Sequence, residues 1–89
     1  MTNTKGIPGD LIENIDKIHT TELGAKRIIK NLGLKTDDVA GWCIRGIYSA
    51  DDIFRKGKNW YVCTSDAIIT INAGSYTIIT AHKKNPIST

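Results

Sequence analysis

The chain of 89 residues has room for one small domain, and its 40% hydrophobic and 24% charged residues are ordinary for a globular protein. A formal charge of +3 permits a nucleic-acid or acidic-protein partner without requiring one. No run approaches the roughly 18 apolar residues of a membrane span, and the start MTNTKGIPGD lacks the apolar core of a secretion signal, so we expect a cytoplasmic protein without a membrane contact.

We expect a single domain over residues 1–89, with flexible ends near 1–7 and 85–89. The first half has helical periodicity. Pro8 is suited to opening a helix over residues 9–18, in which apolar side chains recur at helical spacing. These side chains are Leu11, Ile12, Ile15 and Ile18.

Two further helices are predicted from their end signals. Thr20 or Thr21 can cap a second helix, and Gly33 offers the left-handed conformation that ends helices. Thr36, followed by Asp37 and Asp38, marks the start of a third helix, because acidic groups in the first turn complement the helix dipole.

The apolar period changes after residue 52. Isoleucine, valine, threonine and aromatic residues dominate, and short breaks divide the segment into strands near 52–56, 59–64, 67–72 and 75–82. The fold class is therefore predicted as α+β, with two to three N-terminal helices packed on a four-stranded antiparallel β-meander.

Two-residue turns would place Trp60 across from Ile71, and Ile71 across from Tyr76, on the face that packs on the helices. The opposite face would carry one row of Tyr61, Thr70 and Thr77 and another of Asn59, Asn72 and Ser75. A slip of one residue exchanges the two faces.

Cys43 and Cys63 are twenty positions apart and lie in apolar surroundings, which predicts buried, reduced thiols. Neither has a CxxC neighbour, and acidic residues are sparse in the second half of the chain. No phosphate-binding loop and no metalloprotease or hydrolase motif occurs. We therefore expect neither a metal nor another cofactor.

His82 ends the last predicted strand and is followed by Lys83 and Lys84. A neighbouring ammonium disfavours imidazolium, which leaves the histidine able to accept a proton as a general base. The alternative is a solvated strand end without a function.

His19 precedes Thr20 and Thr21, where two hydroxyls at a helix start and an imidazole could hold a phosphate. It could equally be only the residue before a helix cap.

The densest basic stretch is RKGKNWY, residues 55–61. Basic side chains beside stackable aromatics match the way single-stranded RNA is held, by phosphate neutralisation and base stacking. A basic hairpin can also serve only solubility or protection of a sheet edge.

The motifs IHTTELGAKRIIKNLGL, RKGKNWYV and TINAGSYTIITAHK, in this order and spacing, resemble a family of small bacterial and phage-associated proteins known as a domain of unknown function. The resemblance covers residues 11–84 and implies no activity. A weaker resemblance, in element order and in the strand YTIITAH, is to the barnase, EndoU and RelE-like metal-independent RNA-cleaving toxins. It implies a catalytic sheet with His82, Thr80, Tyr76, Ser75, Lys58, Arg55 and His19 at the matching positions.

The first hypothesis is therefore a small metal-independent endoribonuclease of a toxin or phage-defence system. In it, His82 takes the ribose 2′-hydroxyl proton, Arg55 or Lys58 stabilises the charged phosphate, and His19 or Tyr76 protonates the leaving oxygen. RNA-binding roles are predicted for Lys56, Asn59, Tyr61, Ser75, Thr80 and Lys83.

A second hypothesis is a non-catalytic module that binds protein or nucleic acid, such as a phage-encoded inhibitor of a bacterial defence system. Its partner would be RNA, a target protein or a cognate inhibitor. A third is a subunit that forms a homodimer through an exposed apolar part of the sheet.

Overall fold

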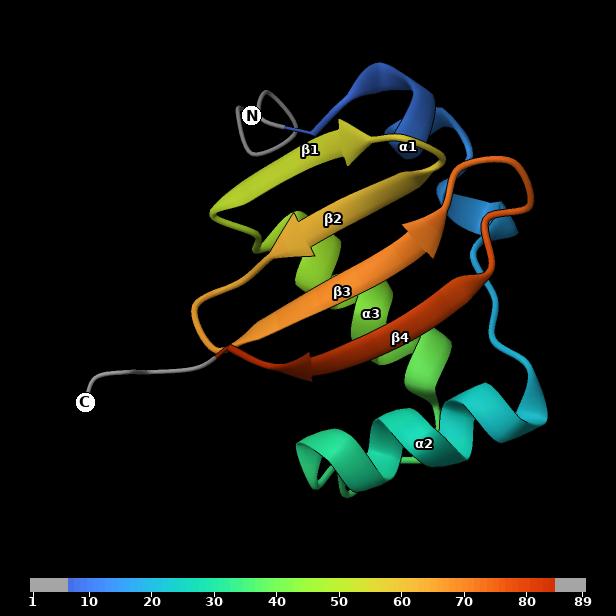
Figure 1. The fold of residues 1–89 in the computed structure, drawn as a ribbon, viewed down its shortest axis with the longest axis vertical. Coiled ribbons are helices and arrows are strands. Elements are labelled where there is room, and N and C mark those ends of the chain that lie inside the picture. Colours follow the sequence, from blue (N-terminus) through green and yellow to red (C-terminus); the bar gives the residue numbers. More distant parts are fainter. Residues whose placement is uncertain (1–6, 85–89) are drawn as a thin grey trace.

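The computed structural model describes residues 7–84, so the predicted flexible ends lie outside it apart from Ile7, which is buried. Helices precede strands along the chain, which confirms the predicted α+β class (Figure 1). No helix among these residues is long and apolar enough to cross a membrane.

The first predicted helix, over residues 9–18, is divided at Asn14. It consists of α1 (Gly9–Glu13) and a 3₁₀ turn, η2 (Ile15–Lys17). The Asn14 side chain donates to the Asp10 carbonyl at 2.7 Å, and the Asn14 backbone N–H donates to the Leu11 carbonyl instead. The Asn14 side chain thus occupies the Asp10 carbonyl, which would accept from the Asn14 backbone N–H in a continuing α-helix.

The second helix begins where the sequence predicts, whereas the third begins later than the predicted start at Thr36. The Gly24 N–H donates to the Thr21 hydroxyl at 3.0 Å at the start of α2 (Glu22–Leu32), and Gly33, with φ of 64°, ends the helix. The Gly41 N–H donates to the Asp38 carboxylate at 3.1 Å at the start of α3 (Val39–Tyr48). Thr21 is therefore the cap of α2, while Asp38 caps α3 and does not lie in its first turn as predicted.

The four strands are β1 (Asp52–Lys56), β2 (Asn59–Cys63), β3 (Ala67–Asn72) and β4 (Ile78–Lys83), paired antiparallel in chain order. Gly57, with φ of 62°, occupies the first position of the two-residue turn between β1 and β2. Glycine adopts a positive φ at little cost, which suits a tight hairpin turn.

The register of β4 differs from the prediction. Its first paired residue is Ile78, which lies opposite Ile71, where Tyr76 was expected. The predicted two-residue turn is a longer one, because the Asn72 side chain accepts from the Gly74 and Ser75 N–H groups, both at 2.9 Å. Turn residue Tyr76 then takes the left-handed conformation, with φ of 60°.

A bulge lies within β4 beyond that turn. Thr70 pairs with Thr80 and Ile71 pairs with Ile78, so Ile79 is an extra residue between the two partners. The side chain of Ile79 is 43% exposed. Thr80 therefore lies opposite Thr70, where Thr77 was expected, and Tyr61, Thr70 and Thr80 form one row across the sheet.

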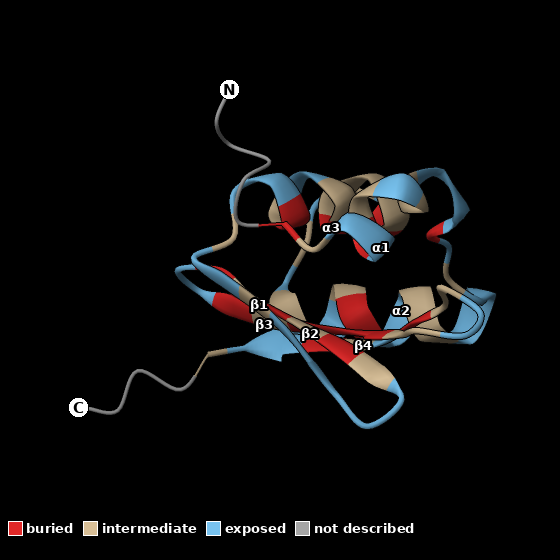
Figure 2. Ribbon diagram, turned by 90° about the horizontal axis from the view of Figure 1, so that it is seen from above, coloured by how far each residue is buried: buried red, intermediate tan, exposed pale blue. Residues whose placement is uncertain are grey.

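The helices cover one face of the sheet and one of its edges. Figure 2 shows α1 and α3 on the same side of the sheet, while α2 lies beside it along β4. The described residues place no helix on the other face. The fold is therefore an asymmetric pair of layers, with a core between α3 and the sheet.

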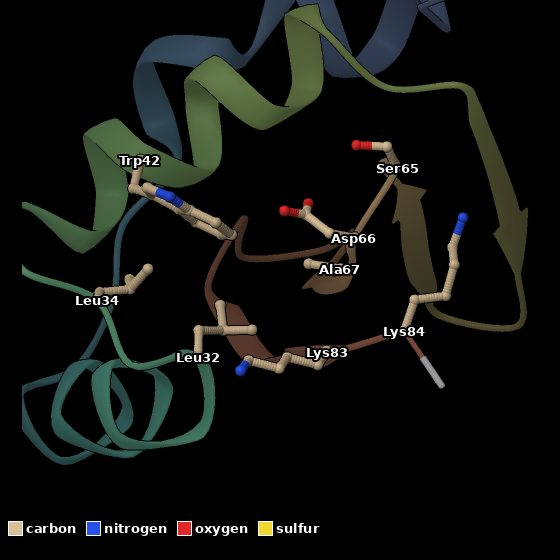
Figure 3. A pocket seen from close by; sticks show the side chains of 8 residues that line it. All are labelled: Leu32, Leu34, Trp42, Ser65, Asp66, Ala67, Lys83 and Lys84. Atoms are coloured by element: carbon tan, nitrogen blue, oxygen red, sulfur yellow. The ribbon is translucent and has the colours of Figure 1, made fainter. Parts of the chain in front are cut away.

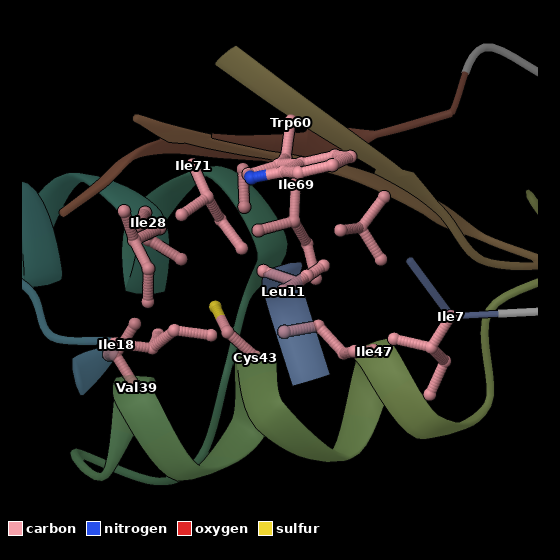
Figure 4. Packing of buried hydrophobic residues seen from close by; sticks show 13 residues of the cluster. Ile7, Leu11, Ile18, Ile28, Val39, Cys43, Ile47, Trp60, Ile69 and Ile71 are labelled. Carbon is pink, nitrogen blue, oxygen red and sulfur yellow. The ribbon is translucent and has the colours of Figure 1, made fainter. Parts of the chain in front are cut away.

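Thirteen apolar residues from helices, strands and the segment before α1 form that core (Figure 4). Trp60, Val62, Ile69 and Ile71 supply its sheet side, as the alternation of the strands predicts. Cys43 lies among them at 0% exposure, and burial raises the pKa of its thiol to about 12. The remaining members are Ile7, Leu11, Ile18, Ile28, Val39, Ile47, Ile78 and Ala81.

Asp38 and its neighbour Asp37 offer a matched test of the α3 cap. Both are exposed carboxylates, but only Asp38 accepts from the Gly41 N–H. Asp38→Ala should lower the free energy of unfolding by about 1 kcal/mol, whereas Asp37→Ala should change it by less than about 0.5 kcal/mol. Urea unfolding followed by circular dichroism measures both, and equal losses would contradict the cap.

Candidate nucleic-acid interface

One face of the sheet carries side chains that point away from the helices. Successive side chains along a strand point to opposite sides, and directly opposite residues on neighbouring strands share a face, so the register assigns the whole set. We call it the open face. It comprises Asp52, Phe54 and Lys56 of β1, Asn59, Tyr61 and Cys63 of β2, Ile68, Thr70 and Asn72 of β3, and Thr80 and His82 of β4.

An aromatic pair lies on the open face near its free edge. The rings of Phe54 and Tyr61 are stacked, with centroids 5.4 Å apart and planes inclined by 21°. Phe54 is 43% exposed, and the two rings line a shallow hollow together with Lys56. An exposed ring beside an ammonium group can stack a base and neutralise its phosphate.

Polar side chains extend this surface across the sheet. Thr70 and Thr80 continue the row that begins at the aromatic pair, and Asn59 lies opposite Asn72 near the turns. Thr70 is only 7% exposed, whereas Asn59 and Thr80 are half-buried. The predicted RNA-binding residues Lys56, Asn59, Tyr61 and Thr80 therefore do share one face.

Arg55 and Lys58 lie apart from this face. Arg55 is on the helix side of β1, where its guanidinium carbon is 5.5 Å from the Trp60 ring centroid and its Nε donates to the Gly57 carbonyl at 3.0 Å. Lys58 lies in the turn, where its carbonyl accepts from the Ala73 N–H. Its exposed side chain belongs to the tip of the hairpin.

His19 is held against the β3–β4 turn. Its Nε2 is 3.1 Å from the Thr77 hydroxyl, and its Nδ1 is 2.8 Å from the Lys17 carbonyl. Because a carbonyl only accepts, Nδ1 carries the proton and Nε2 accepts from Thr77 when the imidazole is neutral. The Ser75 hydroxyl is 2.7 Å from that of Thr77, which extends the hydrogen-bonded chain into the turn.

The hydroxyl of Tyr76 is likewise used within the fold. It donates to the Asp10 carbonyl at 3.3 Å and accepts from the Asn14 side chain at 3.2 Å. Ser75, Tyr76 and His19 thus join the turn to the N-terminal segment. These bonds give all three residues a structural role beside the catalytic or binding roles predicted for them.

His82 lies at the far end of the open face from the turns. It is opposite Ile68 and exposed. His82 is five positions from Thr77, which corresponds to about 16 Å at about 3.3 Å per residue. Thr77 in turn pairs with His19. The nuclease hypothesis requires His82 within reach of one phosphate with Arg55 or Lys58, but these groups lie toward opposite ends of the strands, and His19 lies at the end away from His82.

Lys83 points to the other side of β4 from His82. It pairs with buried Ala67 and lines a cleft of about 540 Å³ at the end of the sheet (Figure 3). The cleft is formed by Leu32, Leu34, Trp42, Ser65, Asp66, Ala67, Lys83 and Lys84. Lys83, which the sequence predicts as an RNA-binding residue, therefore lies away from the open face, since adjacent strand residues face opposite ways.

Phe54 is the member of the interface that sequence reasoning missed. The Gly57–Lys58 turn, read with the alternation of residues 52–56, places Phe54 opposite Tyr61. The turn and the alternation of β1 are therefore the sequence signals that identify Phe54. Among residues 7–84, no three His, Cys, Asp or Glu side chains gather as a possible metal site.

A family model described as "Protein of unknown function (DUF3781)" matches residues 12–82. No curated protein and no solved structure matches the chain.

The two cysteines should differ in reactivity. Cys43 is buried with a raised pKa, so it carries almost no thiolate near pH 8, whereas Cys63 is half-buried on the open face. Iodoacetamide should therefore modify one thiol of the native protein, at Cys63, and both thiols in denaturant. Intact-mass analysis and peptide mapping measure this, and modification of Cys43 in the native protein would contradict the assigned core.

Proposed function

The chain belongs to the DUF3781 family, and we propose that it is a non-catalytic module that binds single-stranded RNA on its open face. The observation that carries the proposal is the stacked pair of exposed Phe54 and half-buried Tyr61 beside Lys56, on the sheet face that no helix of residues 7–84 covers. Other four-stranded antiparallel sheets bind single strands through exposed aromatics that stack two or three bases.

The size of the open face suits a short stretch of single strand. Four strands spaced by about 4.8 Å span about 14 Å between the outer two, and five residues of a strand add about 16 Å in the other direction. Two or three unstacked bases can lie on a surface of this size. A double helix would reach it only with its backbone, which makes unpaired RNA the better ligand.

Charge favours the same partner. Lys56 lies at one end of the open face and His82 at the other, while Asp52 is its one acidic member. Lys58 lies in the turn next to Lys56. The chain carries a formal charge of +3. Phosphates can therefore approach the hairpin end of the aromatic pair without meeting a carboxylate.

Hydroxyl and amide groups next to the rings supply the polar contacts. Thr80 and Asn59 flank Tyr61 and its partner Thr70 in the register. Hydroxyls and amides donate and accept, so they can bond to base edges and to the ribose 2′-hydroxyl, which distinguishes RNA from DNA.

The free thiols of Cys43 and Cys63 support a reducing compartment, and we propose that the protein acts in the cytoplasm. A setting in a toxin or phage-defence system, or as an inhibitor of one, stays a prediction from the sequence.

Endoribonuclease activity also stays a prediction, and the geometry gives it less support than binding. A general base needs a charge-stabilising group within reach of the same phosphate. Arg55 packs over Trp60 on the opposite side of β1, and Lys58 lies at the opposite end of the sheet from His82.

Removal of either ring should weaken RNA binding. Tyr61→Ala and Phe54→Ala should each cost about 1–3 kcal/mol, or about 5- to 150-fold in Kd, because each ring stacks one base. Fluorescence anisotropy with a labelled single-stranded oligoribonucleotide at about 50 mM salt measures the change.

Tyr48→Ala is the matched control, since Tyr48 is 44% exposed, close to the 43% of Phe54, but lies at the end of α3. It should bind as the unchanged protein does. Equal affinities for all three variants, or no binding by the unchanged protein, would overturn the proposed interface.

Total RNA incubated with the protein in a chelator should stay intact, because Arg55 and Lys58 lie away from His82 and cannot stabilise the charge of the same phosphate. His82→Ala should then retain most of the RNA affinity, since the aromatic pair supplies the main contacts. Gel electrophoresis of the RNA measures cleavage. Fragments that appear with the unchanged protein and disappear with His82→Ala would restore the ribonuclease hypothesis.

A further inference from the structure

The two edges of the sheet differ in what covers them. On the β4 edge, the Ile78 N–H donates to the His19 carbonyl at 2.8 Å, and the Asn31 side chain donates to the Ala81 carbonyl at 3.3 Å. Helix α2 packs along the same strand (Figure 1). On the other side, β1 pairs with β2 alone among residues 7–84.

The β1–β2 turn determines which backbone groups of β1 are free. In a two-residue turn, the flanking residues Lys56 and Asn59 are hydrogen-bonded to each other, and hydrogen-bonded pairs then recur at every second residue. The N–H and C=O groups of Phe54 therefore point toward β2. Those of Ile53 and Arg55 point to the free edge, where another strand can meet them.

We propose that two copies of this chain pair through β1 as antiparallel strands, with the two-fold axis at Phe54. A two-fold axis perpendicular to the sheet keeps the open faces of both copies on one side. Ile53 then lies opposite Arg55 of the second copy, and both have backbone groups that point to the shared edge. The register thus agrees with the free hydrogen-bonding groups.

Charge and the backbone groups that are free to pair select this register over its neighbours. With the axis at Phe54, each Asp52 lies directly opposite Lys56 of the other copy, on the same face, and opposite charges in such positions attract. An axis at Asp52, Arg55 or Lys56 would place two like charges opposite each other. An axis at Ile53 would place Asp51 opposite Arg55, but the Asp51 N–H already donates to the Cys63 carbonyl of β2 at 2.8 Å, and Asp52 would lie opposite Phe54.

The pairing joins two four-stranded sheets into one sheet of eight strands. The two Phe54 side chains meet at the axis as a non-hydrogen-bonded pair, in which side chains approach most closely. Because each Phe54 stacks on Tyr61, four rings form a continuous row across the dimer. The dimer itself does not depend on RNA binding, although it would double the proposed RNA-binding surface.

Charge reversal tests the register. Asp52→Lys and Lys56→Asp should each yield a monomer, because each places like charges opposite one another twice per dimer. The double variant, Asp52→Lys with Lys56→Asp, has the same net charge as the unchanged chain and should form the dimer again. Sedimentation equilibrium over a wide protein concentration range measures all four proteins, with circular dichroism as the check of folding.

Cross-linking tests the same register by a measurement that does not depend on the charges. Phe54→Cys in a Cys63→Ser background should form an intermolecular disulfide on mild oxidation, because residues at the axis lie within disulfide distance. Tyr48→Cys in the same background is the control and should stay uncross-linked. A monomeric unchanged protein, or a dimer that neither single charge reversal disrupts, would overturn the proposal.

Discussion

The organisation of this protein depends on a mismatch between the two faces of its sheet and the helices available to cover them. Two of the four helical segments between residues 7 and 84, α1 and η2, have only five and three residues, and α1 and α3 lie together on one side (Figure 2). Ile69 and Ile71 are fully buried there, whereas Thr70 between them points to the open face. Period-two alternation therefore separates a hydrophobic core from a polar and aromatic surface within single strands. The open face is thus a product of the same pattern that builds the core.

A similar asymmetry governs the sheet edges. The chain uses His19 and Asn31 to satisfy backbone groups of β4, and it places α2 along that strand. Among residues 7–84, β1 pairs with β2 alone, and three of its five residues are charged. Charged side chains on a short edge strand commonly prevent unwanted pairing. Here Asp52 and Lys56 are complementary in one two-fold register, so the same charges that exclude other registers permit that one.

Most of the fold could be predicted from local signals. The caps of α2 and α3, the strand breaks and the alternation in β2 and β3 depend on neighbours a few residues away. The errors arise from distant partners. Tyr76 contacts Asp10 and Asn14 across more than sixty residues of sequence, and this contact accompanies the break in the first helix and the left-handed turn before β4. The site followed the same rule, since Tyr61 and Asn59 were correctly grouped, whereas the position of His82 required the register of β4.

The basic end of β4 illustrates why proximity in sequence is poor evidence for a shared site. His82 and Lys83 are adjacent, but strand geometry sends the imidazole to the open face and the ammonium toward the cleft beside Asp66. Cooperation between them on one phosphate would require the backbone between them to leave the extended conformation, which the pairing of both residues with β3 prevents. The strand therefore contributes one polar group to each of two surfaces. A function for the cleft would accordingly be independent of the open face, since no side chain of β4 belongs to both.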